Sequence, residues 1–121
     1  MSKAFAVFMA AIAVSTGAWA CSCMRSDRQA IIANSDAAFR ARVLKVSRMG
    51  DENTGQVVAT IRILRSYKGV RSGRVLRLAT GANSAMCGIE FRKGDTISVG
   101  ASKTGKRSYQ TGLCAILPDP Q

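Results

Sequence analysis

Alternation of apolar and polar residues runs through most of the chain and predicts β-strands. Phe39, Ala41 and Val43 alternate with arginines, and the apolar phase then moves to Leu44 and Val46. One inserted residue turns all later side chains to the other face of a strand, so a change of phase is typical of a β-bulge. We therefore expect a long first strand that contains a bulge.

The same alternation predicts four further strands, and turn signals separate them. The strands are expected at residues 56–67, 74–80, 96–101 and 107–113, with turns or loops at 50–55, 68–73 and 81–88. The side chains expected to face inward are Val57, Ala59, Ile61, Ile63, Leu76, Leu78, Ile97, Val99, Tyr109 and Leu113. Five short strands with turns between them predict a mainly-β domain that closes into a small barrel.

A short helix is expected before the first strand, at residues 26–34. Ser26 is placed as its N-cap, with Gln29 three residues later, which is the pattern of a capping box. The apolar residues 30–32 would face the barrel.

Residues 1–20 have the pattern of a secretory signal peptide and not of a folded element. Lys3 precedes an apolar run at 4–14, and the sequence Ala-Trp-Ala at 18–20 fits a small-x-small cleavage site. The run is too short to span a membrane. Cleavage after Ala20 would export a chain that begins at Cys21, to the periplasm or the extracellular space. We expect one domain at 21–117 and a loose tail at 118–121.

All four cysteines follow the predicted leader: Cys21, Cys23, Cys87 and Cys114. An even number of cysteines in an exported chain predicts a disulfide framework. A bridge between Cys21 and Cys23 would close a strained ring and is disfavoured. The two remaining pairings both tie the start of the domain to its middle and its end.

Such bridges would give the exported protein a fixed N-terminus, although chain termini are usually loose. In an extended segment alternate side chains share a side, so Ser22 and Met24 would point away from the two bridged cysteines. The segment would thus present a free α-amine and two side chains to any partner.

Charge and composition exclude most kinds of catalysis. The chain has 18 Lys and Arg, 7 Asp and Glu and no histidine, which gives a formal charge of +11. Without histidine, Ser/His/Asp triads and Cys/His pairs are absent, and no pair of carboxylates has a spacing that indicates acid/base catalysis. We expect no enzyme activity and no cofactor.

The positive charge predicts attraction to polyanions such as glycans, lipopolysaccharide or anionic membrane surfaces. A specific nucleic-acid role is disfavoured, because barrels that bind single strands use exposed aromatic platforms. Four aromatic residues follow the leader, and Phe39 and Tyr109 among them are expected to be buried.

Three motifs make the chain similar to a known family. They are CSC at 21–23, NSAMCGI at 83–89 and GLC at 112–114. Together they resemble the N-terminal domain of the tissue inhibitors of metalloproteinases, a netrin-like module with a five-stranded, Greek-key oligonucleotide/oligosaccharide-binding (OB) barrel. The resemblance covers residues 21–117 and implies bridges Cys21–Cys87 and Cys23–Cys114. With four cysteines, the chain departs from the animal inhibitors, which carry a third disulfide in this domain.

The resemblance also implies a mechanism of inhibition. The α-amine and carbonyl oxygen of Cys21 would chelate the catalytic zinc of a target protease, and Ser22 would enter the pocket beside it. The other residues implied to contact the protease are Cys23, Met24, Ser84, Ala85 and Met86. A protease zinc holds three protein ligands and leaves one position open, and a neutral amine can occupy that position.

Other interpretations of the same residues remain. Cys21 and Cys23 are explained equally well if the protein is a basic extracellular or periplasmic binding module. Their disulfides would then only stabilise the fold. A lipoprotein acylated at Cys21 is disfavoured by Ala18 and Trp19 at positions where such leaders carry other residues. A zinc site made of the four cysteines is the third possibility. Residues 84–86 are also explained by a plain turn of small residues with a methionine as filler.

Overall fold

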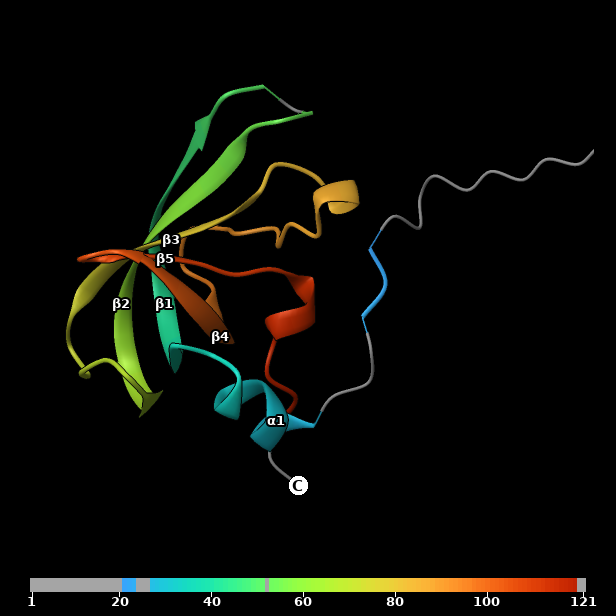
Figure 1. Ribbon diagram of the computed structural model, residues 1–121. Helices are drawn as coiled ribbons and strands as arrows, with labels where there is room; N and C mark the ends of the chain where they lie inside the picture. Colours follow the sequence, from blue (N-terminus) through green and yellow to red (C-terminus); the bar gives the residue numbers. More distant parts are fainter. Residues whose placement is uncertain (1–20, 24–26, 52, 120–121) are drawn as a thin grey trace, which may run out of the picture.

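The computed structural model describes residues 21–23, 27–51 and 53–119. The predicted leader, Met24 and the predicted N-cap Ser26 lie outside these residues. The elements are α1 (Arg28–Ala33), β1 (Ala37–Met49), β2 (Gln56–Lys68), β3 (Val75–Gly81), η2 (Ser84–Met86), β4 (Thr96–Gly105), β5 (Ser108–Gln110) and η3 (Leu113–Ala115) (Figure 1). The two η elements are single 3₁₀ turns.

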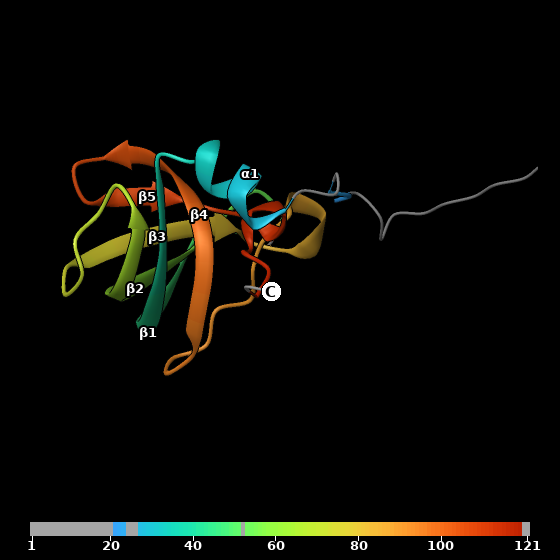
Figure 2. The same cartoon turned by 90° about the horizontal axis from the view of Figure 1, so that it is seen from below.

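The five strands form a closed barrel in the order β1-β2-β3-β5-β4, which confirms the predicted fold class. β4 pairs with β1 and closes the barrel, and β3 pairs with β5 in parallel, while the other pairs are antiparallel. Seen from below, α1, η2 and η3 gather at one side of the barrel, and the β2–β3 and β4–β5 turns lie at the other (Figure 2).

The predicted bulge in the first strand is confirmed. Val43 pairs with Ile61 and Lys45 pairs with Thr60, so Leu44 is the inserted residue. The insertion turns Val46 toward the barrel, where it packs against the core although it is out of phase with Val43. A bulge increases the local twist of a strand, which helps a long strand to coil around a small barrel.

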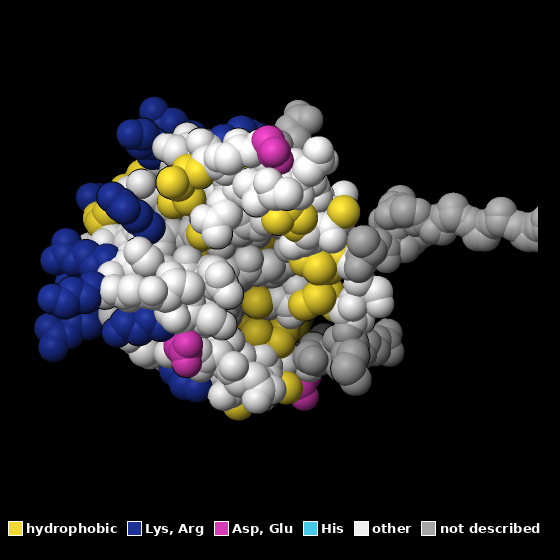
Figure 3. Space-filling model, turned by 45° about the horizontal axis from the view of Figure 1, so that its top comes forward, with side chains coloured by type: hydrophobic (Ala, Val, Ile, Leu, Met, Phe, Trp, Pro, Cys, Tyr) yellow, Lys and Arg dark blue, Asp and Glu magenta, His cyan; other side chains and the backbone are white. Residues whose placement is uncertain are grey.

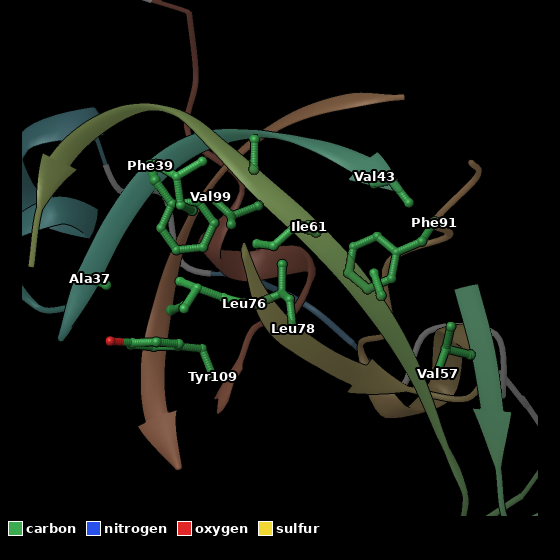
Figure 4. Packing of buried hydrophobic residues seen from close by; sticks show 14 residues of the cluster. Ala37, Phe39, Val43, Val57, Ile61, Leu76, Leu78, Phe91, Val99 and Tyr109 are labelled. Atoms are coloured by element: carbon green, nitrogen blue, oxygen red, sulfur yellow. The ribbon is translucent and has the colours of Figure 1, made fainter. Parts of the chain in front are cut away.

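The core contains almost all the residues predicted to face inward. The largest fully buried side chains are Phe39, Ile61, Ile63, Leu78, Val43 and Val99, and Figure 4 shows most of this cluster. Tyr109 is buried as expected, and Ile97 packs against the cluster.

Leu113 is the exception, and its predicted inward position is wrong. β5 ends at Gln110, and Leu113 begins the turn η3 with 38% of its surface exposed. The reason is tertiary: the Leu113 amide donates a hydrogen bond to the Cys87 carbonyl oxygen at 2.9 Å, which draws the chain out of the barrel wall.

The predicted helix forms, but its N-cap is Asp27 and not Ser26. The Asp27 carboxylate accepts a hydrogen bond from the Ala30 amide at 2.8 Å, as a cap does. Aspartate and serine are both common N-cap residues. Here the Asp27 side chain is the one that accepts a hydrogen bond from the amide three residues later, so the helix begins after Asp27.

The helix lies outside the core, since none of its residues is fully buried. It packs where β4 carries Gly100: an added side-chain carbon there would lie 3.1 Å from Ile31 Cγ2. Lys68 Nζ donates hydrogen bonds to the carbonyl oxygens of Ile32 and Ala33 at the end of the helix.

We predict that Leu78→Ala lowers the free energy of unfolding by about 2–5 kcal/mol, because it leaves a cavity in a fully buried site. Val75→Ala, on the same strand but 40% exposed, should change it by about 1 kcal/mol or less. Urea unfolding followed by circular dichroism measures both values. Equal losses for the two variants would contradict the placement of the core.

Candidate functional site

Two disulfides hold residues 21–23 against the barrel. Cys21 is bonded to Cys87 and Cys23 to Cys114, each with a Cα–Cα distance of 5.2 Å. This is the pairing that the resemblance implied, and it resolves the choice that cysteine counting alone left open. Ser22 lies between the two bridged residues with its side chain exposed.

The loop that carries Cys87 is fixed by its own hydrogen bonds. The Asn83 side chain accepts a hydrogen bond from the Met86 amide at 3.0 Å, and the Asn83 carbonyl oxygen accepts one from the Gly88 amide at 3.1 Å. Cys87 adopts a left-handed backbone with φ 58°, which reverses the chain after η2. Gly81 and Gly88 touch closely, and a side chain on Gly88 would collide with the Gly81 carbonyl oxygen.

The segment that carries Cys114 is hydrogen-bonded both to the loop that carries Cys87 and to β4. The Cys87 carbonyl oxygen accepts the Leu113 amide hydrogen bond described above, which joins the two disulfide-bearing loops directly. Beyond the turn, Ile116 forms a bridge with Val99, and the Leu117 amide donates a hydrogen bond to the Ser98 carbonyl oxygen at 2.9 Å. Both anchors of the N-terminal segment are therefore attached to the barrel by backbone contacts.

The disulfides bring together most of the residues that were predicted to contact a protease. Ser22 and Cys23 are exposed, as are Ser84, Ala85 and Met86, and the Cys21–Cys87 bond joins the two groups. We call residues 21–23 together with 84–86 the inhibitory edge, because the family resemblance implies that these residues contact a protease. Met24 lies outside the described residues.

The structure adds apolar residues to this region that sequence reasoning missed. Leu113 and Ile116 expose 38% and 44% of their surfaces on either side of Cys114. The sequence did carry a signal for them, since apolar residues lie on both sides of Cys114. It was not used because the predicted strand at 107–113 placed Leu113 in the core.

A cavity of about 670 Å³ lies beside the inhibitory edge, between α1, the ends of β3 and β5, and the two 3₁₀ turns. Met86, Cys87, Cys114 and Ala115 form the wall shared with the edge. Figure 3 shows a hollow with apolar side chains on this side of the molecule. Among the described residues that line the cavity none is charged, so it favours neutral groups.

Charge is absent from the edge itself. Residues 21–23, 84–88 and 111–117 contain no Asp, Glu, Lys or Arg. Within the described residues the only ion pair joins Arg92 and Glu90 at 3.3 Å, with both side chains largely exposed.

Asp51 lies in the turn between β1 and β2, and the pKa of its carboxyl group departs clearly from the usual value. Hydrogen bonds to its carboxylate from the backbone amides of Thr54 and Asn53, and from the Thr54 hydroxyl, lower the pKa of Asp51 below its usual 3.8. This turn is held by hydrogen bonds and takes no part in the edge.

The sulfur atoms of Cys21, Cys23 and Cys114 lie within 4.8 Å of one another. All four cysteines are consumed in disulfides, and the part of the chain that the structure describes has no free cysteine. A metal binds thiolates and not disulfide sulfurs, so the four-cysteine zinc site is not formed in this oxidised state.

No helix among the described residues is long and apolar enough to cross a membrane.

We predict that the double variant Cys23→Ser/Cys114→Ser loses up to roughly 4–5 kcal/mol of unfolding free energy. The sequence separation of 91 residues closes a long loop in the unfolded chain, which the chain-entropy model values in that range. Urea unfolding of the oxidised protein measures the loss, and Ser22→Ala on the same segment is the matched control. A loss no larger than that of Ser22→Ala would contradict a stabilising role for the bridge.

Comparison with known proteins shows a clear family relationship. A family model described as "Tissue inhibitor of metalloproteinase" matches residues 19–117. Metalloproteinase inhibitor 3 of Xenopus laevis is 30% identical over 107 residues, covering 86% of this chain and 49% of the relative. The chain thus spans about half the length of the curated relative. Both descriptions name inhibitors and not enzymes, which agrees with the expectation of a protein without enzyme activity.

Proposed function

Because the chain belongs to the tissue inhibitor of metalloproteinase family, we propose that it inhibits a zinc metalloprotease through the inhibitory edge. The observation that carries the proposal is the double anchoring of residues 21–23. Each cysteine of the segment is bonded to a loop that is itself hydrogen-bonded, and Ser22 is exposed between them.

The proposed chemistry needs a free amine at Cys21, which cleavage after Ala20 would produce. The amine nitrogen and the carbonyl oxygen of Cys21 can close a five-membered chelate ring on a metal. A protease zinc with three protein ligands has one position for water, and the chelate would displace that water. The Ser22 side chain would then enter the pocket beside the zinc.

The edge is suited to insertion into a cleft. Its disulfides fix the backbone before binding, so little conformational entropy is lost on association. It carries no charged side chain, so its insertion desolvates no charged side chain. Cys23, Met24 and residues 84–86 would contact the cleft alongside, joined by the exposed Leu113 and Ile116.

The leader pattern at residues 1–20 supports export, to the periplasm or the extracellular space, where disulfides persist. Acylation of Cys21 would consume the amine, so a lipid-anchored form would not inhibit by chelation.

A second candidate function, binding of a polyanion, is favoured by a separate observation. The chain has 18 basic residues, and within its described part a single ion pair neutralises one of them. Most of the positive charge is therefore available to a partner.

We predict that one alanine added before Cys21 of the processed protein weakens inhibition about 100-fold or more, which corresponds to about 2.7 kcal/mol. The extra residue replaces the amine with an amide nitrogen and blocks the approach to zinc. Inhibition constants against a panel of zinc metalloproteases measure the effect, and an alanine added after Gln121 is the control. Full inhibition by the N-terminally extended protein would rule out chelation.

Inhibition should also depend on pH, because only the neutral amine binds zinc. An α-amine has an ordinary pKa of about 7.7–8.0, so each unit of pH below that range should weaken inhibition about tenfold. The measurement is the inhibition constant between about pH 5.5 and 8.5, corrected for the protease's own profile. The inhibition constant of the alanine-extended variant should not change with pH in this way. An equal pH dependence for the extended and the unextended protein would contradict the mechanism.

A further inference from the structure

We propose that the exposed Cys23–Cys114 disulfide is a reaction site for small-molecule thiols. Its opening passes the exchange on to the neighbouring Cys21–Cys87 disulfide, so that one thiol molecule rearranges both bridges. We call this sequence of exchanges the disulfide relay. It is chemistry of the protein's own bridges, and it goes beyond protease inhibition and does not depend on it.

The two disulfides differ in their access to solvent. Cys23 and Cys114 are both exposed. Cys21 and Cys87 are both half-buried. Thiol–disulfide exchange begins when a thiolate attacks one sulfur atom of a bridge, so access to that atom governs the rate. A dissolved thiol therefore reacts first at the Cys23–Cys114 bridge.

The surroundings of the exposed bridge do not repel a thiolate, which carries a negative charge. No Asp or Glu occurs at residues 21–23, 84–88 or 111–117, the segments that carry the four cysteines. Like-charge repulsion at these segments would slow the approach of the attacking group. Its absence leaves the bridge open to thiols of different charge.

A third sulfur atom lies beside the exposed bridge. The sulfur atoms of Cys21, Cys23 and Cys114 all lie within 4.8 Å of one another. Cys21 belongs to the other disulfide, so a thiolate released from the exposed bridge is one short movement from the next bond that it can attack. Exchange between neighbours in a folded chain needs no second collision with a dissolved thiol.

Attack on the exposed bridge can release either of two thiolates, and one of them continues the relay. Attack on the Cys114 sulfur releases Cys23, whose bond to Cys21 would close a strained ring. Attack on the Cys23 sulfur leaves the thiol bonded to Cys23 and releases the Cys114 thiolate. This thiolate attacks the Cys21 sulfur. A bond forms between Cys21 and Cys114, the Cys21–Cys87 bond breaks, and the electron pair leaves on the Cys87 sulfur.

The relay is complete without any oxidant. In its last step the Cys87 thiolate attacks the Cys23 sulfur, which forms a Cys23–Cys87 bond and releases the original thiolate. Two disulfides are present before and after, so no electrons are gained or lost and the thiol acts as a catalyst. The product is the alternative pairing of residues 21–23 with the same two segments. Under the proposed function, it would present a different edge to a protease.

The backbone keeps the two segments together while the bridges exchange. The Leu113 amide donates a hydrogen bond to the Cys87 carbonyl oxygen at 2.9 Å, and this contact does not depend on either disulfide bond. A side-chain carbon added at Gly112 would lie 2.9 Å from the same oxygen, which shows how closely the segments approach. The exchange therefore moves residues 21–23 relative to a platform that stays in place.

The test treats the processed, oxidised protein with reduced glutathione in the absence of air, at about pH 8, where part of the thiol is ionised. Free thiols are trapped with N-ethylmaleimide, and the bridges are mapped in acidic peptide digests by mass spectrometry. In molecules that carry one glutathione, we expect it on Cys23. In about a tenth or more of these molecules, Cys21 should be bonded to Cys114 and Cys87 should be alkylated. Retention of the Cys21–Cys87 bond in all of them would overturn the relay.

Two single variants provide a matched pair, because each removes the same bridge. Cys23→Ser leaves Cys114 as a free thiol, and about a tenth or more of the molecules should be alkylated at Cys87 without added glutathione. Cys114→Ser leaves Cys23 as the free thiol, and alkylation is expected almost entirely at Cys23. Equal alkylation of Cys87 in both variants would indicate scrambling through unfolding and would contradict the relay. Thermal unfolding checks that the variants fold, and the result for the unmodified protein decides the question if they do not.

These measurements need no protease, so the relay and the inhibition are tested separately. Failure of the relay would leave zinc chelation standing. Failure of the unmodified protein to inhibit any zinc metalloprotease would refute the proposed function and leave the relay standing.

Discussion

The inhibitory edge depends on one constraint, the pair of disulfides that hold residues 21–23. These residues belong to no helix or strand, and such a segment is ordinarily mobile. Bonds at Cys21 and Cys23 leave one residue, Ser22, between two fixed points. The geometry of the proposed chelate therefore comes from covalent bonds and not from secondary structure.

The barrel supplies the other half of that constraint. Cys87 and Cys114 lie outside the strands. They can hold residues 21–23 in place only if their own segments are held in place. The Asn83 cap, the close approach of Gly81 and Gly88, and the hydrogen bond from Leu113 to Cys87 provide this. The core of the barrel in turn holds the strands from which both loops emerge. Packing of the core thus determines where the two loops lie.

Much of the fold was predictable from the sequence because its signals are local. Alternation located the strands, and the phase change at Leu44 located the bulge. The N-cap was wrong because Ser26 and Asp27 are adjacent and both suited to capping. Leu113 was misplaced because the contact that draws it outward is with Cys87, far away in the chain.

The candidate site was predictable only in part, for a related reason. Four cysteines allow three pairings, and the correct one followed from family resemblance and not from spacing. The grouping of basic side chains between the β2–β3 and β4–β5 turns was not predictable at all. Arg71 and Arg107 are distant in sequence, and the parallel pairing of β3 with β5 is what brings their turns together.

Zinc chelation requires that the exported protein begins with a free amine at Cys21. Intact mass of the unreduced protein, with peptide mapping of its N-terminus and bridges, measures this directly. We predict an unmodified chain starting at Cys21, lighter than its reduced form by two hydrogens for each of the bridges Cys21–Cys87 and Cys23–Cys114. An acylated Cys21, or a chain processed at another residue, would contradict zinc chelation by that amine.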